Sequence, residues 1–85
     1  MKMNIYSIRD VKTGKFSAID IQERDEVEIR GFAYAINGGN EIMAFKPKDF
    51  DLYKLGEYDY ATGVITPLSM PELIVNGESV VGDNK

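Results

Sequence analysis

Two pairs of acidic side chains have the spacing that acid–base chemistry needs. Asp49 and Asp51 form one pair, and Glu57 and Asp59 form the other. Residues two apart in a β-strand share a face, so each pair could act as a general acid and base or bind a divalent cation. Acidic residues at strand ends are also common as plain solvated side chains, and we favour that interpretation for both pairs.

The rest of the catalytic inventory is small. The 85 residues include no histidine and no cysteine, which removes the commonest general base, the commonest metal ligand and every thiolate nucleophile. Gly38-Gly39 follows a predicted helix instead of preceding one, which is the wrong context for a phosphate loop. We therefore predict a binding protein and not an enzyme, with no cofactor and no metal site.

Basic and aromatic side chains offer a different chemistry. Single-stranded DNA is bound by cations at its phosphates and by rings that stack on its bases. The net charge of −4 repels nucleic acid, so such binding requires the cations to gather in one patch. The rings of Phe32, Phe50 and Tyr53 fit better in the core. The residues that we predict to contact DNA are Lys12, Lys15, Arg30, Tyr34, Lys46, Lys48, Lys54 and Tyr60.

Strands and tight turns must position these side chains. Alternating and β-branched residues predict four strands, the last ending at Pro67 or lying at a sheet edge, over residues 4–10, 15–21, 52–58 and 64–66. The same D-x-x-T-G spacing occurs between each pair of strands, at Asp10 to Gly14 and at Asp59 to Gly63. We interpret it as one hairpin turn used twice, with glycine in a left-handed conformation.

One helix is predicted over residues 26–37. Its apolar positions recur at helical spacing and form a single stripe of Ile29, Phe32, Ala33 and Ile36. Asp25 and Glu28 resemble a capping box with Asp25 as the N-cap, and Asn37-Gly38-Gly39 is a stop signal. In the connector that follows, Met43, Ala44 and Phe45 are expected to fold back onto the core. The predicted fold class is α+β, a small antiparallel β-β-α-β-β sheet with the helix packed on one face.

The last part of the chain is predicted to extend beyond this domain. We place the domain at 1–68 and a C-terminal extension at 69–85. Asn76-Gly77 lies between two apolar runs, which indicates a third hairpin, with a flexible tail that docks on a partner as the alternative. So short a domain has a thin core and two free sheet edges, both of which favour a homodimer. We expect neither a secretion signal nor a membrane span.

Several segments resemble a known family. Ile29-Arg30-Gly31-Phe32 with Ala35-Ile36-Asn37 is similar to a segment of the small nonstructural protein of gokushovirus-type microviruses, phages with circular single-stranded DNA genomes. Residues 46–59 followed by Thr62-Gly63 resemble that family's Pro-x-Asp-aromatic segment, its Leu-aromatic-basic-aliphatic-Gly strand and its Asp-x-x-Thr-Gly turn. The opening residues 5–10 also fit, so the resemblance covers about residues 4–68.

The sequence departs from the family pattern in three places. Lys46 stands where the family often has histidine, the loop after Asn37 is rich in glycine, and the tail from Ser69 has no counterpart. The matching motifs are turns, caps and core positions, and they carry no binding residues to transfer. The resemblance implies a nonstructural phage protein in the host bacterial cytoplasm, associated with single-stranded genome replication or the switch to packaging.

Two functions from different classes follow. The first is an accessory protein that binds single-stranded DNA through the basic and aromatic side chains named above. The second is a homodimeric interaction module that docks on a viral or host replication or packaging protein without contacting DNA. The acidic balance and the apolar tail favour the second function.

Overall fold

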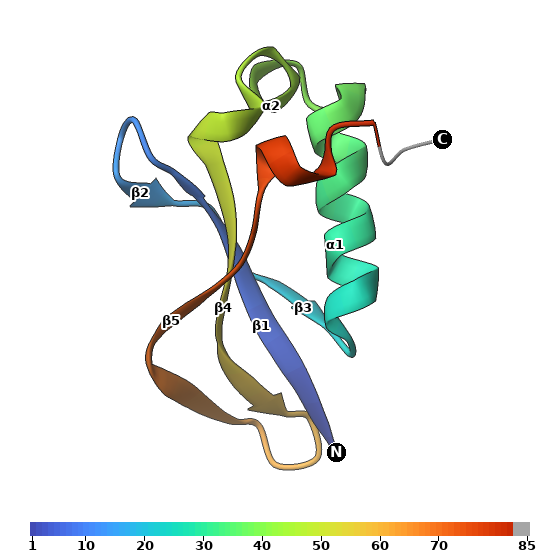
Figure 1. Cartoon of the computed structure of the whole chain (residues 1–85). Helices are drawn as coiled ribbons and strands as arrows, with labels where there is room; N and C mark the ends of the chain where they lie inside the picture. The colour runs from blue at the N-terminus through green and yellow to red at the C-terminus, as the bar shows by residue number, and fades with distance from the viewer. Residues whose placement is uncertain (83–85) are drawn as a thin grey trace.

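The computed structural model describes residues 1–82 and has the predicted α+β architecture. A five-stranded antiparallel sheet curls into a half-barrel, and one helical segment of 15 residues lies between its strands in sequence (Figure 1). The strands are β1 Lys2–Asp10, β2 Lys15–Phe16, β3 Asp20–Gln22, β4 Phe50–Asp59 and β5 Val64–Asn76. The α-helices are α1 Asp25–Tyr34 and α2 Glu41–Phe45. Within residues 1–82, no helix is long and apolar enough to cross a membrane.

The two predicted hairpins meet through their first strands. The sheet order is β2-β1-β4-β5, and β3 also pairs with β1, beyond β2 along the same edge. The prediction of one continuous strand over 15–21 is wrong, because the chain leaves the ladder between β2 and β3. At the break, the hydroxyl of Ser17 accepts the Ile8 N–H (3.0 Å) and thus replaces a backbone partner.

The helix forms about where it was predicted, but its start differs. Arg24 is the N-cap and makes no side-chain cap, so the predicted capping box at Asp25 is wrong. The Asp25 carboxylate instead accepts a hydrogen bond from the Tyr6 hydroxyl. After α1 the chain continues as a π-helical turn, η1 Ala35–Gly39, and Gly38 ends it at φ 132°.

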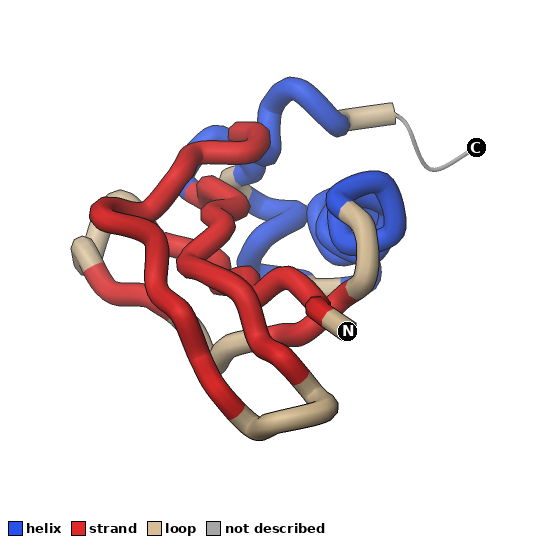
Figure 2. The backbone as a smooth tube through the Cα atoms, turned by 90° about the horizontal axis from the view of Figure 1, so that it is seen from below, coloured by secondary structure: helices blue, strands red, loops and turns tan. Residues whose placement is uncertain are grey.

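The core lies between α1 and one face of the sheet. Tyr6 and Leu52 are fully buried, and the helix stripe contributes Phe32, Ala33 and Ile36, whereas Ile29 packs at the margin. Met43 folds back as expected, but Phe45 does not and stays 78% exposed. Figure 2 shows the helical segments gathered on one side of the strands, so within residues 1–82 no helix covers the other face of the sheet.

Strand β5 is much longer than predicted. It passes through Pro67 and Pro71 and ends at Asn76. Both prolines are tolerated because β5 is the edge strand of the sheet, where a missing N–H breaks no ladder. Between Pro67, opposite Gly56, and Glu72, opposite Lys54, the register shifts and β5 arches away from β4.

The predicted C-terminal hairpin is wrong. Asn76 caps a 3₁₀ helix, η3 Gly77–Val80, by accepting the Glu78 N–H at 2.9 Å. Val80 is buried in the core, and the Asn37 amide donates to its carbonyl at 2.9 Å. The described part of the predicted extension 69–85 therefore packs on the core, and residues 83–85 lie outside the described chain.

Candidate nucleic-acid interface

The two predicted D-x-x-T-G turns have the same hydrogen-bond pattern. In the first turn, the Asp10 side chain accepts a hydrogen bond from the Lys12 N–H at 2.9 Å, and the Asp10 backbone carbonyl accepts one from the Gly14 N–H at 2.8 Å. Asp59 makes the same two bonds to Ala61 (2.9 Å) and to Gly63 (2.7 Å). Gly14 and Gly63 adopt φ values of 73° and 81°, which only glycine takes without strain. The first turn holds Lys12 and Lys15 at its two ends.

A second lysine segment lies against this turn. Lys46 and Lys48 flank Pro47, which begins the short 3₁₀ helix η2 Pro47–Asp49. The Val11 N–H donates to the Asp49 carbonyl at 2.9 Å, and β1 pairs with β4 up to Asp10 and Phe50. Two segments that are about thirty residues apart in sequence thus meet at one end of the molecule, beside α2 (Figure 1).

Arg9 belongs to the same group, although it was not predicted. A Cβ placed on Gly14 would lie 3.8 Å from an Arg9 guanidinium nitrogen, so the guanidinium reaches the first turn. Its place there follows from strand pairing, since Arg9 pairs with Phe16 in β2. The basic end, as we call this group, consists of Arg9, Lys12, Lys15, Lys46 and Lys48.

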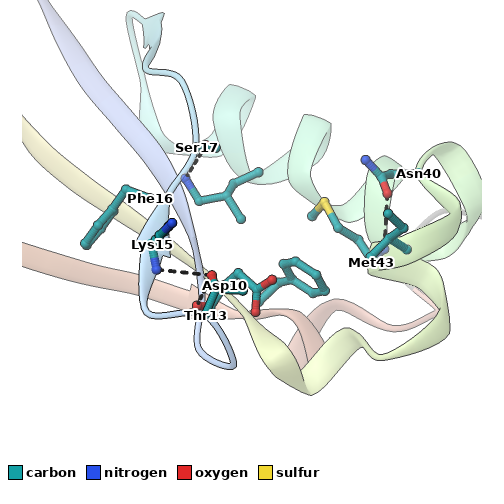
Figure 3. A pocket seen from close by; sticks show the side chains of 10 residues that line it. Asp10, Thr13, Lys15, Phe16, Ser17, Asn40 and Met43 are labelled. Atoms are coloured by element: carbon teal, nitrogen blue, oxygen red, sulfur yellow. Dashed lines mark hydrogen bonds between the residues drawn. The ribbon is translucent and has the colours of Figure 1, made fainter.

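A shallow cleft of about 430 Å³ opens at the basic end. Ile8, Met43 and Phe50 supply its apolar part, and Asp10, Thr13 and Lys15 line the side of the first turn (Figure 3). On the opposite wall, Asn40 accepts the Met43 N–H at 3.1 Å as the N-cap of α2. The cleft therefore combines an apolar floor with polar walls, in which Lys15 is the cation and Asp10 the anion.

Exposed aromatic rings surround the basic end. Phe16, 43% exposed, meets Tyr53 edge-on with ring centroids 5.4 Å apart, on the face of the sheet away from α1. The prediction that Tyr53 is a core residue is wrong, because Tyr53 pairs with Ser7 on that outer face, whereas Phe32 and Phe50 are buried as predicted. Phe45 projects from α2 with the Lys46 ammonium 5.4 Å from its ring centroid. Neither Phe16 nor Phe45 was among the predicted contact residues.

The other predicted contact residues lie elsewhere. Arg30 and Tyr34 are exposed on α1, and Tyr34 packs its ring over Gly39. Lys54 is half-buried in β4 opposite Tyr6 and Glu72. Tyr60 is in the second turn, at the opposite end of the molecule (Figure 1). The structure therefore brings four of the eight predicted residues together, the lysines at 12, 15, 46 and 48.

Charge is unevenly distributed over the chain. Segments 9–15 and 41–51, which build the basic end and its surroundings, hold five basic and four acidic side chains. Segment 20–28, at the start of α1, holds five acidic side chains and one basic one. Among residues 1–82 the only ion pair joins Lys2 to Glu57 (3.6 Å), so the cations of the basic end are not neutralised by direct partners.

Three of the four residues in the acidic pairs have structural roles. Asp49 is in η2 and Asp51 in β4, so the prediction that they share a strand face is wrong. Asp51 accepts the Asn76 amide at 2.7 Å, Glu57 pairs with Lys2, and Asp59 caps the second turn. Within residues 1–82, no group of three acidic side chains is arranged to hold a metal ion.

Two shifted pKa values lie beneath α1, away from the basic end. Burial, together with a hydrogen bond and charge repulsion from Asp20, raises the pKa of Glu28 to about 7. Burial and the hydrogen bond to Asp25 raise the pKa of Tyr6 above its ordinary value. Both groups support the packing of α1 and do not face the cleft.

A model of the protein family described as Phage ORF5 protein matches residues 3–80. The chain belongs to the Phage ORF5 protein family. The match confirms a phage origin for the resemblance found in the sequence and extends it beyond residue 68, through β5 and η3. No curated protein and no solved structure matches this Phage ORF5 protein.

Proposed function

We propose that this Phage ORF5 protein binds single-stranded DNA through its basic end. The observation that carries the proposal is the meeting of two lysine segments beside an apolar cleft, with no ion pair to their ammonium groups within residues 1–82. Phosphates need cations that are free of ion pairs, and bases need exposed rings such as those of Phe16 and Phe45. In the setting that the sequence resemblance implies, a gokushovirus-type microvirus in the host bacterial cytoplasm, the role is genome replication or the switch to packaging.

The overall charge of −4 restricts how DNA approaches. The acidic segment 20–28 repels phosphates at the start of α1, so a strand is accepted only across the basic end. Because attraction depends on a few cations set against a net negative molecule, binding should weaken steeply with salt.

Titration of a fluorescent oligothymidine at several salt concentrations tests the proposal. Each phosphate contact adds about −0.7 to the log–log salt slope, so four lysines give a slope of about −3. Replacing both Lys12 and Lys48 with Gln should reduce the magnitude of the slope by about 1.4. The matched control replaces Lys2 and Arg24 with Gln, which removes the same charge outside the basic end and should leave the slope unchanged. Absence of binding at low salt, or equal slopes in the two double variants, would refute DNA contact here.

The runner-up is an interaction module that docks on a viral or host replication or packaging protein. Its supporting observation is the long edge strand β5, most of which is exposed, including Ile65, Met70 and Leu73. Affinity capture from phage-infected cells separates the two functions. A complex that nuclease dissolves supports DNA binding, and a nuclease-resistant protein partner supports the module.

A further inference from the structure

The apolar face of the sheet changes sides part-way along β1. Successive side chains of a strand point to opposite faces, yet Ile5 and Tyr6 are 4% and 0% exposed. Tyr6 points toward α1 and belongs to the main core cluster, whereas Ile5 lies outside that cluster. Next to this position β4 has an extra residue, Leu55, between the partners of Ile5 and Tyr6. Beyond the bulge, toward the second turn, the apolar residues lie on the face away from α1.

Strand pairing shows which residues share that face, since directly paired residues of antiparallel strands point to the same side. Met3 pairs with Tyr58, which pairs with Ile65. In the next row, Ile5 pairs with Ile21 on one side and with Gly56 on the other, and Gly56 pairs with Pro67. The outer apolar patch, as we call it, consists of Met3, Ile5, Ile21, Tyr58, Ile65 and Pro67.

The opposite face of the same strand segments is mostly polar, with Val64 as an apolar member. Its side chains alternate with those of the patch and include Lys2 and Glu57, which form the ion pair of 3.6 Å. None of the six patch residues carries a charge. An antiparallel sheet with one apolar and one polar face normally buries the apolar one. In the described chain, Ile65 (59%), Ile21 (37%) and Pro67 remain exposed on this face, whereas Met3 and Tyr58 are half-buried and Ile5 is 4% exposed.

We propose that a second copy of this chain covers the outer apolar patch and that the two copies form a symmetric dimer. The chain exposes 5690 Å², whereas a folded monomer of its size exposes about 5,000 Å². This excess of about 700 Å² belongs to the whole chain, and it is of the same order as the roughly 800 Å² that each partner buries in a standard interface. A two-fold axis through the patch would bring each row of apolar residues against its own copy, so the surface needs only to be complementary to itself.

The charge distribution favours a second copy over nucleic acid at this face. The patch offers no cation to a phosphate, and its aliphatic residues Met3, Ile5 and Ile65 do not stack on bases. The like charges of two copies lie chiefly in segment 20–28 and on the polar face of the strands, so the contact itself brings no like charges together. This dimer does not depend on DNA binding, since the basic end lies at the other end of the sheet (Figure 1).

Light scattering coupled to size-exclusion chromatography, over a wide range of concentrations of the full chain, tests the proposal. The wild type should show a concentration-dependent dimer. Ile65→Lys places a charge in the interface and should weaken dimerisation by at least about tenfold. The control Val64→Lys changes a neighbour that is 56% exposed on the opposite face of β5, and it should dimerise like the wild type.

Ile65→Thr provides a second variant in case the lysine disturbs folding, because threonine keeps the β-branched shape while it removes apolar surface. It should give an intermediate loss, with an unchanged far-ultraviolet circular dichroism spectrum. A wild type that stays monomeric at every concentration overturns the proposal. Equal dimerisation of Ile65→Lys and Val64→Lys does so as well.

Discussion

At the scale of single residues, the contacts beneath α1 depend on partners that are distant in sequence. The spacing of Asp25 and Glu28 indicates a capping box, but both side chains serve other contacts. Asp25 accepts a hydrogen bond from Tyr6, and Glu28 faces Asp20 in β3. Local sequence rules could not distinguish these roles, because the partners come into reach only after the sheet has formed.

Glu28 makes the stability of the fold dependent on pH. Its pKa is about 7 in the folded protein against an ordinary value of 4.5, so between these values only the folded state keeps the proton. The free energy of unfolding should therefore fall as pH rises through this window and level off above it. Glu28→Gln should remove this fall and stabilise the protein at about pH 8 by on the order of 2 kcal/mol, with little effect near pH 4.

Urea denaturation at a series of pH values measures this effect. The control is Glu26→Gln, an exposed position on the same helix, which should follow the pH profile of the wild type. If the two variants have the same profile, the pH dependence does not originate at Glu28.

At the scale of elements, glycine positions report which contacts are tight. Gly31 lies within α1 with no atom near the position of a Cβ, whereas a Cβ on Gly77 would collide with the Pro47 carbonyl oxygen and the Ile36 side chain. Gly77 therefore lets η3 approach η2 and the end of the helix. Nothing in the local sequence distinguishes this close approach from a hairpin turn, which is why Asn76-Gly77 was misinterpreted.

Substituting alanine at these two glycines should have opposite effects. Gly31→Ala should raise the free energy of unfolding by about 0.5–1 kcal/mol, because alanine is the better helix former. Gly77→Ala should lower it by about 1–3 kcal/mol, because η3 must move away from its contacts. Thermal unfolding followed by circular dichroism gives both values. A Gly77→Ala protein as stable as the wild type would show that η3 docks loosely.

At the scale of the whole molecule, the sequence predicted what local patterns determine. The β-β-α-β-β order, the two D-x-x-T-G turns and the helix stripe are set by residues close in sequence, and the structure confirms them. The C-terminal end of strand β5 could not be predicted from the sequence. Whether Pro67 ends the strand depends on whether that strand lies at the edge of the sheet. The change of apolar face at Ile5 and Tyr6 depends on a bulge in β4, which is equally non-local.

The candidate site was predicted in part for the same reason. The lysines at 12, 15, 46 and 48 flank turns, and turns are visible in a sequence. Their convergence depends on the pairing of β1 with β4, which brings the Val11 N–H to the Asp49 carbonyl. Arg9 joins the basic end, and Phe16 lies beside it, through the pairing of β1 with β2, whereas Tyr60 is excluded because its turn is at the other end of the sheet.

The C-terminal segment tests whether the chain unfolds as one unit. Val80 is 3% exposed among core residues from β1, α1 and β4, while its neighbour Val81 is 55% exposed. The Asn37 amide, which donates to the carbonyls of Ala33 (2.7 Å) and Val80 (2.9 Å), ties η3 to the helix.

We expect Val80→Ala to lower the global free energy of unfolding by about 2 kcal/mol, through lost burial and the cavity left behind. Val81→Ala should stay within about 0.5 kcal/mol of the wild type. In urea denaturation, the Val80 variant should shift the midpoint with an unchanged slope, since a cooperative unit loses stability without changing the surface that it exposes. Equal midpoints for the two variants would mean that residues 77–82 separate from the domain before it unfolds.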